Sequence, residues 1–231
     1  MVPSNVLHRT FRIQFGGQVG TCFTLDVDGR QYIVTARHVV PQGAGQVTVQ
    51  IHYESKWAGL PCSVVGIGEG EVDITVLAPP HVISPPLPLE PTTKGMFLSQ
   101  DAYFLGFPYG LHAEVGGLNA NFPLPLVKKA CVSMFALAGT GPWYLLLDGH
   151  NNPGFSGGPV VFALNGQGAA TNVAAVVSGY KYVWDKVFVG EEETELAVKY
   201  NTGIVVAYAI DHALALIRVN PVGAEHPRAV A

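Results

Sequence analysis

The sequence predicts an all-β protein built in two halves, and three observations lead to this expectation. Apolar residues alternate with polar ones at Phe11, Ile13 and Phe15, which is the period of a strand with one buried face. The 27 glycines and 17 prolines among 231 residues suit many short strands joined by turns. Six of the thirteen residues from 79 to 91 are proline, which excludes a helix or a central strand and indicates a connector between the halves.

The remaining strands follow in chain order. The Asp28-Gly29 pair predicts a hairpin turn before the apolar run Tyr32–Val40. A second alternating stretch has Val47, Val49, Ile51 and Tyr53 on one face. After the connector, strands are expected up to the two last ones, at Val173–Ser178 and Gly203–Ala209.

One short helix is expected at the C-terminal end. Ile210, Leu214 and Ile217 fall at i, i+4 and i+7, and Asp211 lies near the start as a possible cap. The whole chain then reads as a single module. Its parts are a first half at about 8–80, the connector at 79–91, a second half at about 92–209, the helix at 210–219 and a loose tail at 220–231.

Composition excludes several classes of function. The chain is 48% hydrophobic and only 13% charged, so it can bury a sizeable core. The net charge of −4 and the lack of a basic stripe argue against nucleic acid as a partner. No run approaches the roughly 18 apolar residues of a membrane helix, so no membrane is expected. The first nine residues lack the apolar core of a signal peptide.

The three cysteines, Cys22, Cys62 and Cys131, lie far apart and lack the spacing of metal ligands. An odd number of cysteines in a chain without a signal peptide favours free thiols in a reducing compartment. We therefore expect a cytoplasmic protein.

The most informative stretch is Asn152–Val160, with the sequence NPGFSGGPV, in which Ser156 lies among glycines just before an apolar run. Glycine allows backbone angles that a Cβ forbids and lets N–H groups converge on one point. Converging N–H donors can stabilise an oxyanion, which is what a serine nucleophile needs. Taken alone, the same pattern also fits a glycine-rich hairpin turn.

Two further segments favour the catalytic interpretation. His38 ends a β-branched apolar run, and Asp73 lies at the centre of the alternating run Glu71–Leu77. A serine hydroxyl is a weak nucleophile until an imidazole removes its proton, and a buried carboxylate holds that imidazole in the required tautomer. The chain supplies all three groups in the order His, Asp, Ser.

These segments resemble the chymotrypsin-like (trypsin-fold) serine proteases, most nearly the bacterial HtrA-type branch. The resemblance rests on Val34–His38, Asp73–Leu77 and Gly154–Pro159, with weaker matches at Leu105–Gly110 and Val176–Gly179. It implies two six-stranded antiparallel Greek-key barrels, with the active site in the cleft between them. It also implies an endopeptidase that cleaves a polypeptide substrate through an acyl-enzyme and needs no cofactor and no metal.

The resemblance also implies a role for each matching residue. His38 becomes the general base, Asp73 its orienting partner and Ser156 the nucleophile. The backbone N–H groups of Gly154 and Ser156 become the oxyanion hole. His150, six residues before the nucleophile, falls at the base of the primary specificity pocket.

The wall of that pocket, which pairs with the substrate main chain, is expected from Ser178, Gly179 and Tyr180. An imidazolium at the pocket base favours an acidic or amide side chain at the cleaved position, although His150 also reads as a solvent-facing turn residue. The acidic stretch Glu191–Glu195 is expected in the loop between the last two strands, near the pocket, where it would attract basic substrates. The two ideas conflict. The other six histidines are expected to be structural or at the surface: His8, His52, His81, His112, His212 and His226.

Three positions depart from the family pattern. Phe155 replaces the acid that pairs with a newly cut N-terminus in trypsin-like zymogens, so packing or a ligand must hold the loop. Arg37 replaces a small residue, and it is either solvated or in contact with a substrate carbonyl or acid. Val39 replaces the cysteine that begins a disulfide in many secreted relatives.

Two other classes of function compete. Gly154-x-Ser156-x-Gly158 also fits the nucleophile elbow of α/β-hydrolases, but that fold requires helices between parallel strands and the order Ser, acid, His. The stronger rival is a protease-fold peptide-binding module that is catalytically silent, or that an activating protein or peptide partner switches on. Phe155 keeps this alternative open.

Overall fold

The computed structural model describes residues 2–138, 141–164 and 171–227, and its first half is a closed barrel. Six antiparallel strands follow the order β3-β2-β1-β4-β5-β6, and the β3–β6 pairing closes the circle. The strands are β1 (Thr10–Phe15), β2 (Gln18–Val27), β3 (Arg30–Thr35), β4 (Gln46–Tyr53), β5 (Lys56–Ile67) and β6 (Thr75–Ala78).

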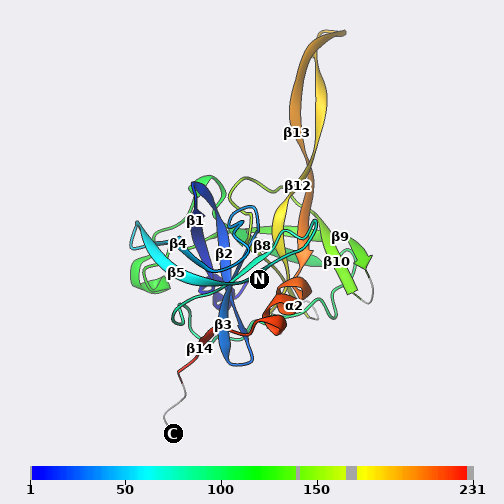
Figure 1. Ribbon diagram of the computed structural model, residues 1–231. Helices are drawn as coiled ribbons and strands as arrows, with labels where there is room; N and C mark the ends of the chain where they lie inside the picture. The colour runs from blue at the N-terminus through cyan, green and yellow to red at the C-terminus, as the bar shows by residue number, and fades with distance from the viewer. Residues whose placement is uncertain (1, 139–140, 165–170, 228–231) are drawn as a thin grey trace.

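The second half is also a closed six-stranded antiparallel barrel, in the order β11-β8-β9-β10-β13-β12, with β11–β12 as the closing pair. Its strands are β8 (Asp101–Gly106), β9 (Leu126–Ala138), β10 (Gly141–Asp148), β11 (Pro159–Ala163), β12 (Thr171–Val189) and β13 (Glu192–Ala209). The expected all-β fold of two barrels and a short C-terminal helix is therefore confirmed (Figure 1).

The period-two patterns place most of their apolar residues in the core of the first barrel, and Phe15 and Tyr53 at the strand ends are half-buried. Phe11 and Ile13 in β1 are fully enclosed, and so are Val49 in β4 and Ile33 in β3. Because successive side chains on a strand point to opposite faces, the alternation in sequence becomes one buried face and one outer face.

The C-terminal helix α2 (Asp211–Val219) packs in the seam between the barrels. Ile210, Ala213 and Ile217 share one apolar cluster with residues of both barrels. Helix α2 contacts β5 and β6 of the first barrel as well as β13 of the second. The expected Asp211 cap is wrong: Ile210 takes the N-cap position, and no side chain caps the helix.

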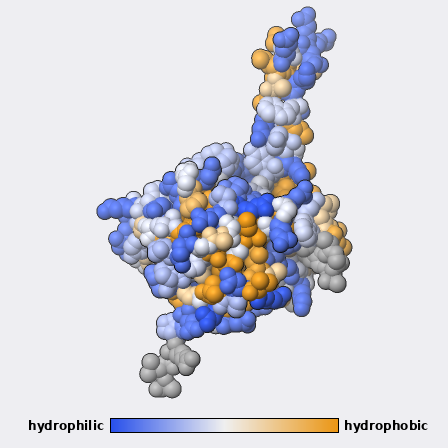
Figure 2. Space-filling model, viewed as in Figure 1, coloured by the Kyte–Doolittle hydropathy of each residue, from blue (hydrophilic) through white to orange (hydrophobic). Residues whose placement is uncertain are grey.

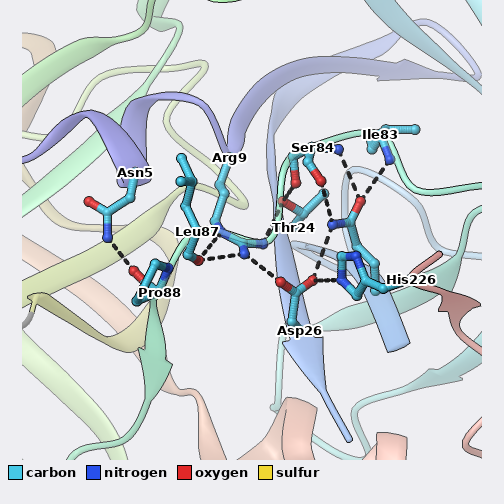
Figure 3. A network of polar contacts seen from close by, with 10 residues as sticks. Asn5, Arg9, Thr24, Asp26, Ile83, Ser84, Leu87, Pro88 and His226 are labelled. Atoms are coloured by element: carbon cyan, nitrogen blue, oxygen red, sulfur yellow. Dashed lines mark hydrogen bonds and ion pairs between the residues drawn. The ribbon is translucent and has the colours of Figure 1, made fainter. Parts of the chain in front are cut away.

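The proline-rich connector runs along the first barrel until the short strand β7 (Glu90–Pro91), which pairs in parallel with β12. Arg9 joins the connector to the first barrel, and its side chain is buried, with only 1% exposed (Figure 3). Its guanidinium donates to Leu87 O and pairs with the Asp26 carboxylate. Farther along, the Ser84 hydroxyl bonds to Thr24 Oγ1 at 2.6 Å.

The segment after α2 corrects the expectation of a loose tail. Strand β14 (Ala224–Glu225) adds to the edge of β3, and His226 Nε2 lies 2.9 Å from Asp26 Oδ1. The backbone of this segment therefore pairs with the first barrel, which is why the tail is fixed as far as His226. The last part of the predicted tail, 228–231, lies outside the described residues.

The last two strands are much longer than expected. Their ladder continues from Ala175↔Ala209 out to Val189↔Glu192, whereas β10 pairs with β13 only as far as Ile204. Residues 181–201 therefore form a two-stranded arm that projects from the second barrel (Figure 1). The acidic stretch Glu191–Glu195 lies at the far end of this arm, not in a loop beside the pocket, because the aromatic and β-branched residues around it extend both strands.

The remaining helical elements are short: α1 (Ser4–Leu7), η1 (Pro108–Gly110) and η2 (Gly116–Asn119). Among the described residues, no helix has the length and apolar character needed to cross a membrane.

Candidate active site

Two paired strands of the first barrel bring His38 and Asp73 together. His38 follows β3, Asp73 precedes β6, and the ladder between these strands pairs Thr35 with Thr75. The His38 Nδ1 and Asp73 Oδ2 atoms are 2.7 Å apart, and the His38 backbone N–H donates to Asp73 Oδ1 at 2.9 Å. The carboxylate thus holds both the ring, through Nδ1, and the main chain of the histidine.

Ser178 is the second donor to this carboxylate. Its hydroxyl donates to Asp73 Oδ2 at 2.6 Å. Burial alone would raise the pKa of Asp73, but the hydrogen bonds from His38 and Ser178 outweigh it and hold the pKa below its ordinary value. Asp73 is therefore an anion beside the imidazole. We expected Ser178 only in the pocket wall, and its hydroxyl has this additional contact.

The loop that carries Ser156 is pressed against the first barrel. A Cβ on Gly157, where φ is +85°, would lie 2.1 Å from Thr21 O. A Cβ on Gly158 would lie 2.0 Å from Leu105 O. Only glycine fits at either position. The Thr21 N–H then donates to Ser156 O at 2.8 Å, which fixes the serine between the barrels.

The Ser156 hydroxyl does not bond to His38 in this structure. It donates to the carbonyl oxygen of Ser178 at 3.1 Å, and no hydrogen bond joins it to the imidazole in the described part of the chain. Ser178 thus contacts both ends of the site, through its hydroxyl at Asp73 and its carbonyl at Ser156.

A tight turn precedes the serine. The Phe155 N–H donates to Asn152 O at 3.3 Å, and Gly154 takes a φ of +110° at the third position, as in a type II turn. Within residues 141–164 and the other described ranges, the N–H groups of Gly154 and Ser156 have no hydrogen-bond acceptor. Two free donors next to a nucleophile have the chemistry of an oxyanion hole.

Phe155 anchors this loop by packing. Its side chain is fully buried in the core of the second barrel and meets Phe104 edge-on, with ring centroids 4.9 Å apart. The Lys128 ammonium lies 5.7 Å from the centre of the Phe155 ring. Of the two anchors that the sequence left open, packing or a ligand, the described residues supply packing.

Arg37 braces the approach to Asp73. Its guanidinium donates to Gly68 O at 2.7 Å and to Gly70 O at 2.8 Å, in the loop that leads to Asp73. We expected either a solvated side chain or a substrate contact, and neither expectation included these two hydrogen bonds to the backbone. The guanidinium fork fits two neighbouring carbonyls, so Arg37 positions the loop that delivers the carboxylate.

The expected specificity residues are only partly brought together. Gly179 and Tyr180 follow Ser178 along β12 and are half-buried, opposite Val206 and Val205. The His150 side chain is exposed, and its carbonyl accepts a hydrogen bond from Lys128 Nζ at 2.5 Å.

Sequence reasoning missed Lys128. Its ammonium also bonds to Asn152 Oδ1 at 2.8 Å, so it links two residues of the loop before the nucleophile. Burial lowers its pKa. Lys128 lies on β9, far from any motif, and only the pairing of the strands reveals its place.

The two-barrel fold and the family to which the chain belongs define a serine protease. Residues 20–167, more than half of the chain, match the trypsin-like peptidase domain, and the chain belongs to that family. A search of curated proteins finds no match.

Several solved structures share the fold. The inactive form of Rv3671c from M. tuberculosis H37Rv, crystallised as a serine-to-alanine mutant, is 19% identical with a TM-score of 0.59, covering 99% of this chain and 92% of that one. A second inactive form of Rv3671c protease is 20% identical with a TM-score of 0.59, covering 94% and 91%. The HtrA-type protease AlgW, solved with a tripeptide, is 19% identical with a TM-score of 0.57. That match covers 93% of this chain and 60% of the AlgW chain.

Proposed function

We propose that the protein is a serine endopeptidase in which Ser156, His38 and Asp73 form the catalytic triad. The observation that carries the proposal is the double hydrogen bond from His38 to the Asp73 carboxylate, next to a loop that holds Ser156 between the barrels. A scaffold without turnover has no physical need for this arrangement.

The groups perform acyl transfer in two stages. Ser156 Oγ attacks the carbonyl carbon of the scissile bond while its proton passes to His38 Nε2, and Asp73 stabilises the resulting imidazolium. The N–H groups of Gly154 and Ser156 receive the negative oxygen. His38 then protonates the leaving amine as the C–N bond breaks. Water repeats the sequence on the acyl-enzyme and regenerates the Ser156 hydroxyl.

The polypeptide substrate lies in an extended conformation along Ser178, Gly179 and Tyr180 in our proposal, and no cofactor takes part. We place an acidic or amide side chain in the primary pocket. The group that supports this preference is the Lys128 ammonium, which bonds to His150 O and Asn152 Oδ1 in the loop before the nucleophile, whereas the His150 side chain is exposed. The competing argument for basic substrates loses its weight, because Glu191–Glu195 lies at the tip of the arm.

One observation favours the second candidate, a protease fold that is silent until a partner protein or peptide activates it. The Ser156 hydroxyl donates to Ser178 O and is not bonded to His38 in the described residues. A ligand that takes over Ser178 O would release the hydroxyl toward the imidazole.

We also propose a reducing, cytoplasmic location. The support is chemical: Cys22 and Cys62 are free and buried in the first barrel, and burial raises the pKa of Cys62 to about 12. Thiols in this state neither pair nor react readily.

Labelling with a fluorophosphonate probe tests the proposal. The wild type and the control Ser133→Ala, which lacks an exposed hydroxyl on β9, are expected to label equally, whereas Ser156→Ala is expected to stay unlabelled. Labelling that survives Ser156→Ala would remove Ser156 as the nucleophile. Labelling that requires added peptide would favour the partner-activated form, and no labelling under either condition would contradict both candidates.

A further inference from the structure

Two histidines and a glutamate meet on the outside of the first barrel, in a cluster that no sequence motif marks. His52 lies near the end of β4, whereas His112 and Glu114 lie in the segment between η1 and β9. One nitrogen or carboxylate oxygen from each residue lies within 4.8 Å of the other two. The cluster therefore joins a strand of the first barrel to a loop that belongs to the second.

The contacts of His112 place two acceptor atoms against each other. Its Nδ1 lies 2.6 Å from Gly110 O, a carbonyl that can only accept, so Nδ1 carries a proton. In the neutral ring, Nε2 then presents a lone pair, yet it lies 2.9 Å from Glu114 Oε1, a second acceptor. Either a second proton or a metal cation must lie between these two atoms. A backbone carbonyl at the other ring nitrogen is a common way to orient a metal-binding histidine.

His52 adds a buried polar group with no partner. Its side chain is 8% exposed, and Nδ1 is enclosed without a hydrogen bond to any described residue. A buried polar atom without a hydrogen bond costs free energy of folding. A cation bound by His52 together with the neighbouring histidine–carboxylate pair would remove that cost.

We propose that His52, His112 and Glu114 bind one zinc ion, with water at the fourth position. Two imidazoles and a carboxylate are a donor set that zinc prefers in tetrahedral sites. Bonds of about 2.1 Å at tetrahedral angles place ligand atoms about 3.4 Å apart. The His112–Glu114 pair must therefore open slightly and the widest pair must close. Glu114, whose side chain is 43% exposed, is free to make that adjustment.

One charge opposes binding. The Arg12 guanidinium stacks over the Trp57 ring at 5.0 Å, and Trp57 in turn meets the His52 ring. The positive charge of Arg12 repels a cation bound at the cluster, so its removal should strengthen zinc binding.

The site lies where it can stiffen the catalytic loop. Three residues before His112, the Tyr109 N–H donates to Pro153 O at 2.9 Å, and the Tyr109 hydroxyl accepts from Asn152 Nδ2 at 3.3 Å. A Cβ on Gly154 would lie 2.4 Å from Phe107 O, so the same segment forms the support of the turn before Ser156. Zinc would fasten this segment to β4 of the first barrel.

Calorimetric titration of the chelator-treated full chain with zinc chloride tests the proposal. We expect one zinc ion per chain in the wild type. Glu114→Gln and His112→Asn each remove a direct ligand, so each should weaken binding by more than the roughly 10- to 100-fold that the loss of an outer-shell partner costs. His81→Ala removes an exposed histidine outside the cluster and is the matched control. Unfolding midpoints without zinc identify any variant that fails to fold, and Arg12→Met should bind zinc more tightly than the wild type.

The catalytic pair is the main competitor for zinc, and a His38→Ala variant separates the two sites. Binding that persists in His38→Ala and is lost in His112→Asn supports the proposal. Binding that is lost in His38→Ala and kept in His112→Asn overturns it, as does the absence of binding in the wild type. Zinc should also slow hydrogen exchange in residues 108–116, and unchanged exchange there would contradict the proposed clamp.

Discussion

The hydroxyl of Ser156 donates its hydrogen to the carbonyl oxygen of Ser178, 3.1 Å away. The Ser178 carbonyl is also on the segment where we propose that the substrate main chain pairs. A substrate N–H that bonds to this oxygen would displace the serine hydroxyl. The hydroxyl would then be free to turn to His38, so that the substrate itself would complete the catalytic arrangement.

Methylating one amide of an inhibitor tests this displacement. We expect a peptidyl phosphonate to lose roughly fivefold in its labelling rate when the amide nitrogen at the cleaved position is methylated, because a lost hydrogen bond is worth about 1 kcal/mol. The control is a pair of fluorophosphonates without an amide, one with and one without an added methyl group, and the two should label the protein at the same rate. Equal rates for the two peptidyl phosphonates would contradict the displacement.

Ser178→Ala removes one of the two side-chain donors on Asp73. The pKa of Asp73 is held below its ordinary value, so this group stabilises the fold above that ordinary value and loses its contribution as the pH falls through the folded pKa. Without the Ser178 hydroxyl, the pKa should rise and the acid unfolding midpoint should move to higher pH. A charged hydrogen bond of about 1–2 kcal/mol predicts a roughly tenfold loss of kcat. Unchanged acid unfolding in this variant would show that the hydroxyl does not hold the carboxylate.

Phe155→Ala should both destabilise the protein and abolish the reactivity of Ser156. Removing a buried phenylalanine costs about 3–5 kcal/mol, and here the lost contacts also fix the turn before the nucleophile. Phe188→Ala is the matched control, because it deletes the same ring from an exposed position on the arm. Thermal unfolding and fluorophosphonate labelling check both effects. Normal labelling by a folded Phe155→Ala protein would mean that another contact sets the loop.

Asp26→Asn should destabilise the first barrel by about 2–4 kcal/mol, because it leaves the enclosed Arg9 guanidinium without its anion. Burial would raise the pKa of Asp26, but hydrogen bonds from Arg9, His226 and Gln31 outweigh it and lower the pKa. The stabilisation is therefore present above the ordinary carboxyl pKa and is lost in acid, and the variant should show a flatter dependence of stability on pH. Denaturant unfolding between about pH 3 and 7 measures it. Asp28→Asn, in the exposed turn two residues on, should behave as wild type.

The sequence was sufficient for the fold, and it supplied the three residues that we propose as the triad. Strand periodicity, the proline-rich connector and the glycines around Ser156 are local patterns, and each has a local physical cause. Phe155 is a partial case: an apolar residue in place of an acid left packing or a ligand as the anchor, and the core of the second barrel supplies packing.

Other features depend on contacts between distant parts of the chain. Nothing near Lys128 indicates that strand pairing brings it to the loop before the nucleophile. His52 and His112 are separated by 60 positions and have unremarkable neighbours, so they were expected to be structural or at the surface. The length of the arm was also missed, because charged residues at a strand tip look the same in sequence as a solvated loop.

The arm gives the molecule two distinct levels of local stability. Beyond the barrel, each strand has a single neighbour, and both faces meet water, with apolar and hydrophilic side chains side by side (Figure 2). Lys186 and Glu193 pair across it at 2.8 Å, and Lys199 lies 3.8 Å above the Tyr182 ring, but exposed contacts of this kind add little. A two-stranded ribbon is only marginally stable in water. The hydrogen bonds of its ladder therefore open and close many times while the barrels stay folded. Amide protons on the arm exchange through this local opening, whereas those in the barrel cores exchange only when the whole protein unfolds.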